Sequence, residues 1–570
     1  MADFVLARFM GPVSSRVFAA RQPSIPLEKP HIVDRLLCNF PALTAGCGEN
    51  RHSLAIGQSC QGFRFVFPVV ATSRKLEDQK MFHFLRLVSI LAVTSCAGTT
   101  YERNALPTQN TKNNLERISQ FDDGPQGVNA VTWVNPESVA ISESLDHELS
   151  STGLRSPIHG LTFLVKDNID VAGAATTAGS AALARAVPPD DADVVAQLRE
   201  AGAILLGKTN MSELALSYGR LGYSATGGLT RNPYDPRRNA SGSSSGAAAA
   251  VAAGFADFAL GTDTAGSIRG PAAVTGLVGM KPTHDLISLD GIIPLSPSLD
   301  VVGPIASTVR LTGLVLVEMM QPSPLQERIR NVLRQNSKVQ PAESKSIGVV
   351  KPIPAGHPDV EQAVSKAITA LAKSGVRIVE IDLPETRQSL WPTLDLIIDA
   401  EFGPALNHYL KSVADGPANL EMLIELSAKD GQINPARLEA LRKVASTKNG
   451  PADKKVRQQL IDRLDALFAQ HGLDAIVFPT IACPASPVYD APDDRYTCDM
   501  ADPYTMSYLA NASSFPEITL PVGVTRHGLP IGMSFFGQAF SEDKLIELGL
   551  ALERVIDPIP APILSSANPN

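Results

Sequence analysis

Two neighbouring loops of small residues indicate both the fold and the chemistry of this chain. The first, Gly242-Ser-Ser-Ser-Gly246, runs directly into an alanine-rich segment at 247–253, and the second is Gly261-Thr-Asp-Thr-Ala-Gly-Ser267-Ile-Arg269. Alanine favours helix, so the first loop is expected at a helix N-terminus, where backbone N–H groups lack partners. The second loop can place N–H groups around an oxyanion. The two loops therefore favour a serine-based acyl-transfer site.

A lysine upstream offers the base that such a site needs. Lys166 ends the apolar run Leu161-Thr-Phe-Leu-Val165, and Asp167-Asn168 follow it. A lysine at the end of a buried strand loses hydration, which lowers its pKa and leaves a neutral amine. Two serines and one lysine are a known way to activate a hydroxyl without histidine.

Three other motif matches have a simpler explanation. The segment Gly202-Ala-Ile-Leu-Leu-Gly207-Lys-Thr209 has P-loop spacing, but its middle is a strand and a helix precedes it. The first serine loop also fits a nucleophile elbow, but residues 232–240 before it are not a buried strand, and no downstream histidine has a suitable context. Ser541-Glu-Asp-Lys544 fits S-x-x-K, yet it opens an amphipathic helix, where an N-cap serine is expected.

The composition is that of a globular protein. The 570 residues are 44 % apolar and 19 % charged, which excludes a disordered, collagenous or disulfide-dense chain. The net charge of −8 gives no basic footprint, so we expect no nucleic-acid partner. We see no His/Cys/Asp cluster with metal-ligand spacing and no glycine-rich cofactor loop, so we expect neither metal nor cofactor.

The first 96 residues differ in character from the rest. They hold 11 Lys and Arg against 6 Asp and Glu, and four of the six cysteines: Cys38, Cys47, Cys60 and Cys96. Residues 81–96 have a weakly basic start, a short apolar run and small residues, which is the layout of a secretory signal peptide. The apolar run is too short for a transmembrane helix, which needs ~20 residues.

Val93-Thr-Ser-Cys96 also resembles the lipobox of a bacterial lipoprotein. We therefore expect an exported protein, either periplasmic or attached to the outer membrane through a lipid on Cys96, with a polar tether over 97–114. Met81 is then the true start, and residues 1–80 form an extension to which we assign no fold. The alternative is a buried hydrophobic segment with a chance cysteine in a cytoplasmic protein.

The remaining chain alternates strand and helix patterns, which is typical of α/β architecture. We expect strands at 160–165, 203–206, 347–350, 376–381, 475–478 and 530–536, and helices at 193–201, 360–374, 454–471 and 541–556. The polar, helical segment 415–450 reads as an insertion or lid. Cys483 and Cys498 form a disulfide if the chain is exported, and two buried thiols are the equal alternative.

Together these segments resemble the amidase signature family. Its hallmarks are a lysine in a Lys-Asp-Asn context, a glycine/serine loop and a Gly-Thr-Asp-x-x-Gly-Ser-Ile-Arg segment, and the chain has all three. Supporting segments are Gly207-Lys-Thr-Asn-Met-Ser-Glu213, Arg231-Asn-Pro-Tyr234, Gly279-Met-Lys-Pro-Thr283, Asp300-Val-Val-Gly-Pro304, residues 511–516 and Leu520-Pro-Val-Gly523. The resemblance covers residues 115–558, leaves 559–570 as a tail, and implies one large domain around a mixed sheet of about eleven strands.

The resemblance implies a role for each catalytic residue. Ser267 is the nucleophile, Ser243 relays the proton after a cis peptide bond with Gly242, and Lys166 is the base. The backbone N–H groups expected to hold the oxyanion are those of Thr264, Ala265, Gly266 and Ser267. The supporting residues expected around them are Ser244, Asp263 and Arg269, for which an ordinary structural ion pair or hydrogen bonds in the core are the alternative.

Two departures from the family pattern bear on the substrate. Ala265 replaces the first of two usual glycines, and Ser245 replaces the usual glycine after the serine pair. The variant loop looks most like the peptide-amidase branch, which implies C-terminal peptide amides or other small acyl or aryl amides as substrates. The alternatives are an enzyme like the amidotransferase subunit that feeds ammonia to aminoacyl-tRNA, and a non-catalytic binding lipoprotein on the same fold.

Overall fold

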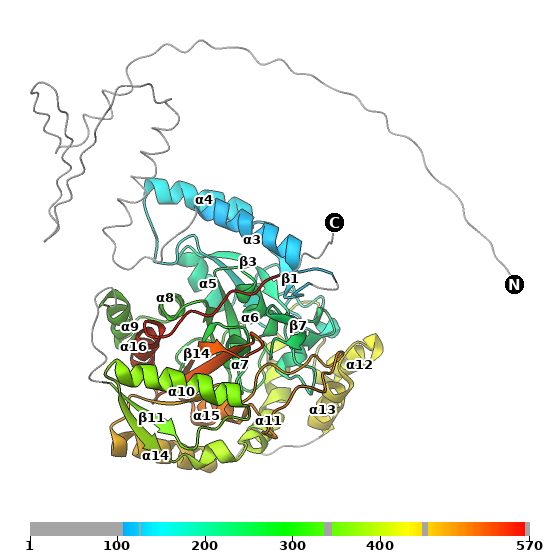
Figure 1. Ribbon diagram of the computed structural model, residues 1–570. Helices are drawn as coiled ribbons and strands as arrows, with labels where there is room; N and C mark the ends of the chain where they lie inside the picture. Colours follow the sequence, from blue (N-terminus) through cyan, green and yellow to red (C-terminus); the bar gives the residue numbers. More distant parts are fainter. Residues whose placement is uncertain (1–105, 125–126, 336–344, 447–453, 565–570) are drawn as a thin grey trace, which may run out of the picture. The chain divides into compact units, whose positions relative to one another are not determined.

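Eleven strands form one sheet in the part of the chain that the structure describes, residues 106–124, 127–335, 345–446 and 454–564. This computed structural model gives the order β1-β3-β2-β8-β10-β9-β14-β15-β13-β11-β12 (Figure 1). The strands are β1 (Val131–Val134), β2 (Thr162–Lys166), β3 (Ile204–Thr209), β8 (Phe258–Asp263), β9 (Val278–Lys281), β10 (Val301–Ala306), β11 (Ser346–Val350), β12 (Arg377–Ile381), β13 (Ala475–Pro479), β14 (Glu517–Val524) and β15 (Pro530–Phe536). The predicted α/β class with about eleven strands is confirmed.

The sheet has parallel pairs toward both ends and antiparallel pairs in its centre. β2 pairs in parallel with β3 and β8, and β11 with β12 and β13, whereas β8, β10, β9, β14, β15 and β13 follow one another antiparallel. The edge strand β1 also pairs antiparallel, with β3. Parallel neighbours need crossover connections. Helix α5 (Asp193–Glu200) supplies one between β2 and β3, and α10 (Pro358–Lys373) supplies one between β11 and β12.

The helices cover the sheet because its inner strands are apolar on both faces. Every residue of β2, β3 and β8 is buried, and Phe163 stacks on Phe258 with ring centroids 5.4 Å apart. The buried residues of α10 include Val360, Val364 and Leu371, which fall on one helical face. The other helices are α3 (Pro107–Phe121), α4 (Ser138–Ser151), α6 (Ser245–Ala252), α7 (Arg269–Val274), α8 (Val309–Met319), α9 (Pro324–Gln335), α11 (Trp391–Tyr409), α12 (Leu420–Asp430), α13 (Pro435–Ser446), α14 (Lys454–His471), α15 (Tyr508–Ser513) and α16 (Glu542–Glu553).

Helix α3 corrects the predicted extent of the tether. Residues 107–114, which we expected to be a polar tether, form the first half of this helix, which lies beside α4 (Figure 1). Pro107 occupies the first turn, a position proline tolerates well. Thr111 and Asn114 are buried, and Asn114 donates to the Thr162 hydroxyl at 2.7 Å. The Asn114 side chain therefore binds the sheet rather than solvent, which composition alone did not reveal. The signal-like segment 81–96, including Cys96, lies outside the described residues.

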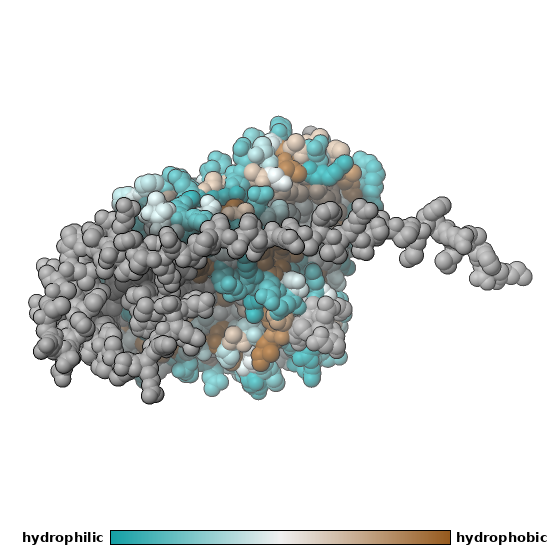
Figure 2. Space-filling model, turned by 90° about the horizontal axis from the view of Figure 1, so that it is seen from above, coloured by the Kyte–Doolittle hydropathy of each residue, from teal (hydrophilic) through white to brown (hydrophobic). Residues whose placement is uncertain are grey.

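The polar segment predicted at 415–450 is helical over most of its described part, residues 415–446, as expected. Its helices α12 and α13 contact each other and α11, and Leu423 and Leu441 are completely buried. The segment is therefore a packed part of the fold, and its role as a lid stays a prediction. Seen from above, the described surface is mainly hydrophilic with small hydrophobic areas (Figure 2). Among the described helices, none is both long and apolar enough to cross a bilayer.

The alternative motifs have structural roles. The P-loop-like segment 202–209 follows α5 and contains β3, as expected, and Lys208 forms a buried ion pair with Asp167 at 3.1 Å. Ser541 occupies the N-cap position of α16, as expected, and its hydroxyl donates to the Gln538 carbonyl at 2.7 Å rather than accepting from a helix N–H. Of the two alternatives left open for Cys483 and Cys498, the structure has the disulfide.

Candidate active site

Lys166 is held at the end of β2 by three acceptors. Its Nζ donates to Ser243 Oγ at 2.7 Å, to Thr262 Oγ1 at 2.8 Å and to the Thr262 carbonyl at 3.3 Å. β2 and β8 are parallel neighbours, so Lys166 at the end of β2 lies beside Thr262 near the end of β8. Asn168 also donates to Thr262 Oγ1, at 3.1 Å, which fixes that hydroxyl.

The environment of Lys166 favours its neutral form. The side chain is completely buried, and burial lowers its pKa from 10.5 to about 7. The carboxylates of Asp263 and Asp300 act in the opposite direction and limit the fall. The predicted desolvated lysine is therefore present, with a hydroxyl in hydrogen-bond contact.

The first serine loop joins Lys166 to the second loop. The Gly242–Ser243 bond is cis, as the resemblance implied. Ser243 is buried, and its carbonyl accepts from the Ser212 N–H at 3.1 Å. A Cβ on Gly242 would lie 2.4 Å from Ser212 Oγ, so a larger residue there would displace the hydroxyl that accepts from the Gly222 N–H at 3.0 Å.

Ser244 links the two loops through its backbone and its hydroxyl. Its N–H donates to the Ser267 carbonyl at 3.2 Å. Its Oγ donates to the Thr262 carbonyl at 3.1 Å and accepts from the Thr262 N–H at 3.3 Å. Ser244 thus connects the segment of Ser243 with that of Ser267, and its supporting role in catalysis stays a prediction.

Ser267 is the accessible member of the group. Its side chain is half-buried, whereas Lys166 and Ser243 are buried. Among the described residues, none forms a hydrogen bond with the Ser267 hydroxyl. The structure therefore brings Lys166 and Ser243 into direct contact and ties Ser267 to the same loop through Ser244, while the Ser243-to-Ser267 proton transfer stays a prediction.

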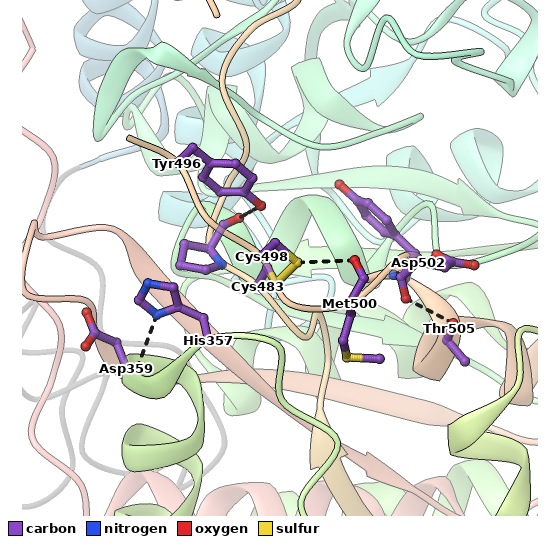
Figure 3. The surroundings of a disulfide bond; sticks show 10 residues. His357, Asp359, Cys483, Tyr496, Cys498, Met500, Asp502 and Thr505 are labelled. Atoms are coloured by element: carbon purple, nitrogen blue, oxygen red, sulfur yellow. Dashed lines mark hydrogen bonds between the residues drawn. A yellow bond between two sulfur atoms is a disulfide. The ribbon is translucent and has the colours of Figure 1, made fainter. Parts of the chain in front are cut away.

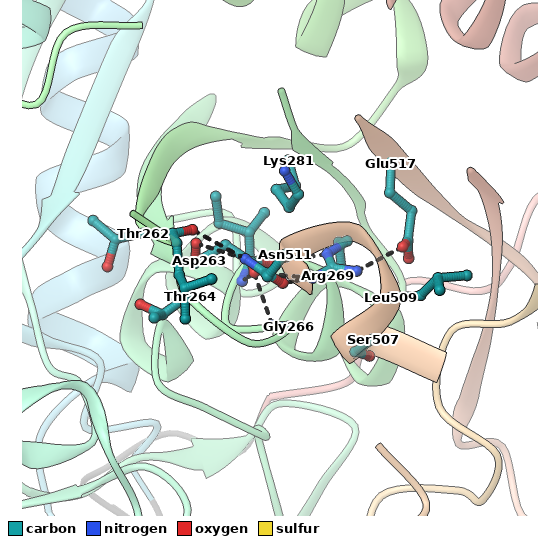
Figure 4. A network of polar contacts seen from close by, with 12 residues as sticks. Thr262, Asp263, Thr264, Gly266, Arg269, Lys281, Ser507, Leu509, Asn511 and Glu517 are labelled. Atoms are coloured by element: carbon teal, nitrogen blue, oxygen red, sulfur yellow. Dashed lines mark hydrogen bonds and ion pairs between the residues drawn. The ribbon is translucent and has the colours of Figure 1, made fainter. Parts of the chain in front are cut away.

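A buried ionic network shapes the second loop (Figure 4). Asp263 accepts from the N–H of Gly266 at 2.7 Å and of Ile268 at 3.0 Å. Arg269 donates to both oxygens of Asp263, at 2.9 and 3.0 Å, and to Glu517 at 2.6 Å. Burial opposes ionisation of Asp263, but Arg269 and these N–H groups hold its pKa well below the usual range. Asp263 and Arg269 therefore brace the loop.

The network corrects one member of the predicted oxyanion site. An N–H has one proton, and that of Gly266 is committed to Asp263, so it does not face a substrate. Among the described residues, none accepts from the backbone N–H groups of Thr264, Ala265 or Ser267. These three remain the candidate oxyanion donors. Ala265, which stands where the resemblance leads us to expect glycine, is the half-buried middle residue of this set.

Several site residues were missed because they come from distant segments. Asp300 accepts from the Thr264 hydroxyl at 2.5 Å and from the N–H groups of Leu295 and Ser296. Asn511 accepts from Arg269 at 2.7 Å and donates to the Asp263 carbonyl at 3.1 Å. The signal was available, since Asp300 and Asn511 lie in segments that carry the family resemblance. Among the described residues, none form a cluster that fits a metal ion.

Known proteins are similar to most of this chain. A family model described as Amidase matches residues 109–546. Mandelamide hydrolase of Pseudomonas putida is 32 % identical over 501 residues, which cover 83 % of this chain and 93 % of that protein. A glutamyl-tRNA(Gln) amidotransferase subunit of Koribacter versatilis is 31 % identical over 485 residues, which cover 82 % of this chain and 99 % of that protein. The X-ray structure of native peptide amidase from Stenotrophomonas maltophilia superposes with a TM-score of 0.71 at 33 % identity, covering 80 % and 96 %.

The ionic network predicts a large loss of stability when its central cation is removed. Arg269→Met leaves Asp263 and Glu517 buried without their cation, which typically costs about 3–5 kcal/mol. The measurement is urea unfolding followed by circular dichroism. The matched control is Arg387→Met, which breaks an exposed pair with Asp382 and should leave the midpoint unchanged. Equal midpoints for both variants would contradict this role of the network.

Proposed function

The chain belongs to the amidase signature family of amide-hydrolysing enzymes, and on that premise we propose that it cleaves amides through an acyl-enzyme on Ser267. The observation that carries the proposal is the buried Lys166 amine, 2.7 Å from Ser243 Oγ, with Ser267 on the adjoining loop. In its neutral form the amine accepts from the Ser243 O–H at this distance instead of donating to it, which is the arrangement that general-base activation requires.

The proposed cycle moves one proton out and back. Neutral Lys166 takes the Ser243 proton as Ser243 takes that of Ser267, and Ser267 Oγ bonds to the amide carbon. The carbonyl oxygen becomes an oxyanion facing the N–H groups of Thr264, Ala265 and Ser267. The proton then returns through Ser243 to the leaving amine as the C–N bond breaks. Water repeats the sequence on the ester and releases the acid.

The proposed substrates are C-terminal peptide amides or other small acyl or aryl amides. The Gly-Ser-Ser-Ser-Gly loop and the 33 % identity with a peptide amidase support this choice. A role like that of the amidotransferase subunit is the second candidate, because a protein of that name is 31 % identical over 82 % of this chain. A non-catalytic binding lipoprotein is the third, and the candidate site argues against it because Lys166, Ser243 and Ser267 are all present.

The substrate proposal is tested with a panel of amides. C-terminal peptide amides, aliphatic amides and aryl anilides are incubated with the protein, and ammonia or amine release is measured. We expect release from peptide amides, lost by at least ~10³-fold in Ser267→Ala, because the acyl-enzyme can no longer form. Turnover of anilides alone would reject the peptide-amide proposal and keep the mechanism. Full activity in Ser267→Ala would reject the mechanism.

The pH dependence tests Lys166 as the base. With a pKa of about 7, the amine is protonated below pH 7, so kcat/KM should fall as the pH drops through 7 and level off above it. Lys281 is an equally buried lysine whose pKa is also about 7, chiefly through burial, but it donates to the Pro282 carbonyl. Lys281→Met should keep the fall of kcat/KM below pH 7. Lys166→Ala should lose this pH dependence and lower kcat/KM by ~10²–10⁴-fold. Loss of this pH dependence in Lys281→Met instead would contradict the assignment of Lys166 as the base.

We also propose that the protein is exported and attached to a membrane through a lipid on Cys96. The signal-like segment 81–96 supports this, and the Cys483–Cys498 disulfide is consistent with an oxidising compartment. Mass spectrometry of the protein from its native host should find Cys96 as a lipid-modified first residue. An intact peptide from residues 1–80 in the mature protein would contradict the proposal.

A further inference from the structure

A long loop closed by the disulfide lies between β13 and α15. It spans residues 480–507, and Cys483 and Cys498 are bonded with their Cα atoms 5.7 Å apart (Figure 3). Inside this loop, Tyr496 donates to the Pro484 carbonyl at 3.1 Å. Its two ends are also joined, because the Ser507 hydroxyl donates to the Thr480 carbonyl at 3.1 Å. We call residues 480–507 the disulfide loop.

The disulfide loop binds the segment that carries Ser243. Asn239 is buried and uses its amide in both directions: Nδ2 donates to the Ser486 carbonyl at 2.8 Å, and Oδ1 accepts from the Ser241 N–H at 2.7 Å. The Asn239 N–H also donates to the Ser486 carbonyl, at 3.0 Å. Ser241 has a φ of 59°, a conformation that residues other than glycine seldom adopt. The bond from Asn239 thus holds an unusual backbone two residues before Ser243.

The same loop packs against the segment that carries Ser267. Gly266 has a φ of 102°, and a Cβ there would lie 2.6 Å from the Cβ of Ser507. A Cβ on Gly270 would lie 3.5 Å from Ile481 Cδ1 and 3.6 Å from Tyr504 Cε1. The ends of the disulfide loop therefore lie directly on both flanks of the nucleophile segment.

The middle of the disulfide loop is attached to the strand before Ser241. Val488 donates to the Arg237 carbonyl at 3.0 Å, and Arg238 pairs with Asp493 at 3.1 Å. Arg238 also lies over the Tyr496 ring, 5.6 Å from its centroid. All three loop residues fall between the two cysteines, so the part of the loop that the disulfide restricts is the part that binds residues 237–239.

We propose that the disulfide loop is a brace that holds the Ser243 and Ser267 segments in one relative position, with Asn239 as its positioning residue. The inference rests on the proposed function, in which a proton passes between these serines. Neither Asn239 nor the disulfide touches the reacting atoms. Both act on geometry, and a displacement of about 1 Å in such a site typically costs ~10²-fold in rate.

The chain offers a matched control for Asn239. Asn135 is also buried, donates through Nδ2 to a backbone carbonyl (Leu205, 2.9 Å) and accepts through Oδ1 from the N–H two residues later (Glu137, 3.1 Å). It follows the edge strand β1. Removing either side-chain amide therefore breaks the same kinds of hydrogen bond. Only in the case of Asn239 do those bonds join the disulfide loop to the segment that carries Ser243.

The test compares Asn239→Ala with Asn135→Ala on an amide that the wild-type protein hydrolyses. We expect kcat to fall at least ~10-fold in Asn239→Ala with KM changed less than ~3-fold, and Asn135→Ala to keep wild-type kcat, although both lower the unfolding midpoint. Equal kcat for both variants would overturn the inference. A wild-type protein without Ser267-dependent activity would instead overturn the proposed function, so the two failures are distinguishable.

Reduction of the disulfide in the folded wild-type protein tests the role of the disulfide loop without any substitution. Cys498 is partly exposed, so a phosphine reductant can reach the bond. Thiol mapping by mass spectrometry confirms that Cys483 and Cys498 are reduced. We expect kcat to fall at least ~10-fold while circular dichroism stays native, and to recover on reoxidation. Undiminished kcat with both thiols free would overturn the role of the disulfide.

Discussion

The hydrogen bond between the Lys166 amine and the Ser243 hydroxyl is the interaction on which the site depends. Its catalytic use requires that the lysine be kept without water, because burial lowers the pKa to about 7 and so leaves a large share of the amine neutral near that pH. The central sheet meets that requirement: β2 is buried over its whole length, and β8 supplies Thr262 as the remaining hydrogen-bond partner. The burial of β2 in the sheet is thus also what lowers the pKa of Lys166.

The second constraint is the conformation of the nucleophile segment. Asp263 and Arg269 neutralise each other in the interior, and Glu517 and Asn511 complete the contacts of the guanidinium. Because Asp263 also binds two N–H groups of the segment, the ion pair sets which N–H groups remain for an oxyanion. The disulfide loop acts on the same segment from outside through Ser507. The position of the nucleophile segment is therefore determined by residues that lie far from Ser267 in the sequence.

Local pattern predicted much of this architecture. Lys166 after an apolar run, the alanine-rich start of α6 and the alternation of strands and helices were all sufficient to identify their elements. Three features were not predictable in the same way. Helix α3 buries polar side chains, so its composition resembled a tether. The N–H of Gly266 turns toward Asp263, which no spacing reveals. The contacts of Asp300, Asn239 and Ser486 depend on long-range packing, for which a single sequence holds no periodic signal.

Covalent labelling with a fluorophosphonate, followed by peptide mapping, tests most directly whether Ser267 is the nucleophile that Lys166 activates through Ser243. Trypsin cuts after Arg238 and Arg269, so Ser243 and Ser267 fall on one peptide, and fragmentation must separate them. We expect one adduct per molecule, on Ser267 as the nucleophile, formed more slowly when Lys166 is replaced by alanine. An adduct on Ser243, or none on this peptide in a protein that hydrolyses amides, would contradict it.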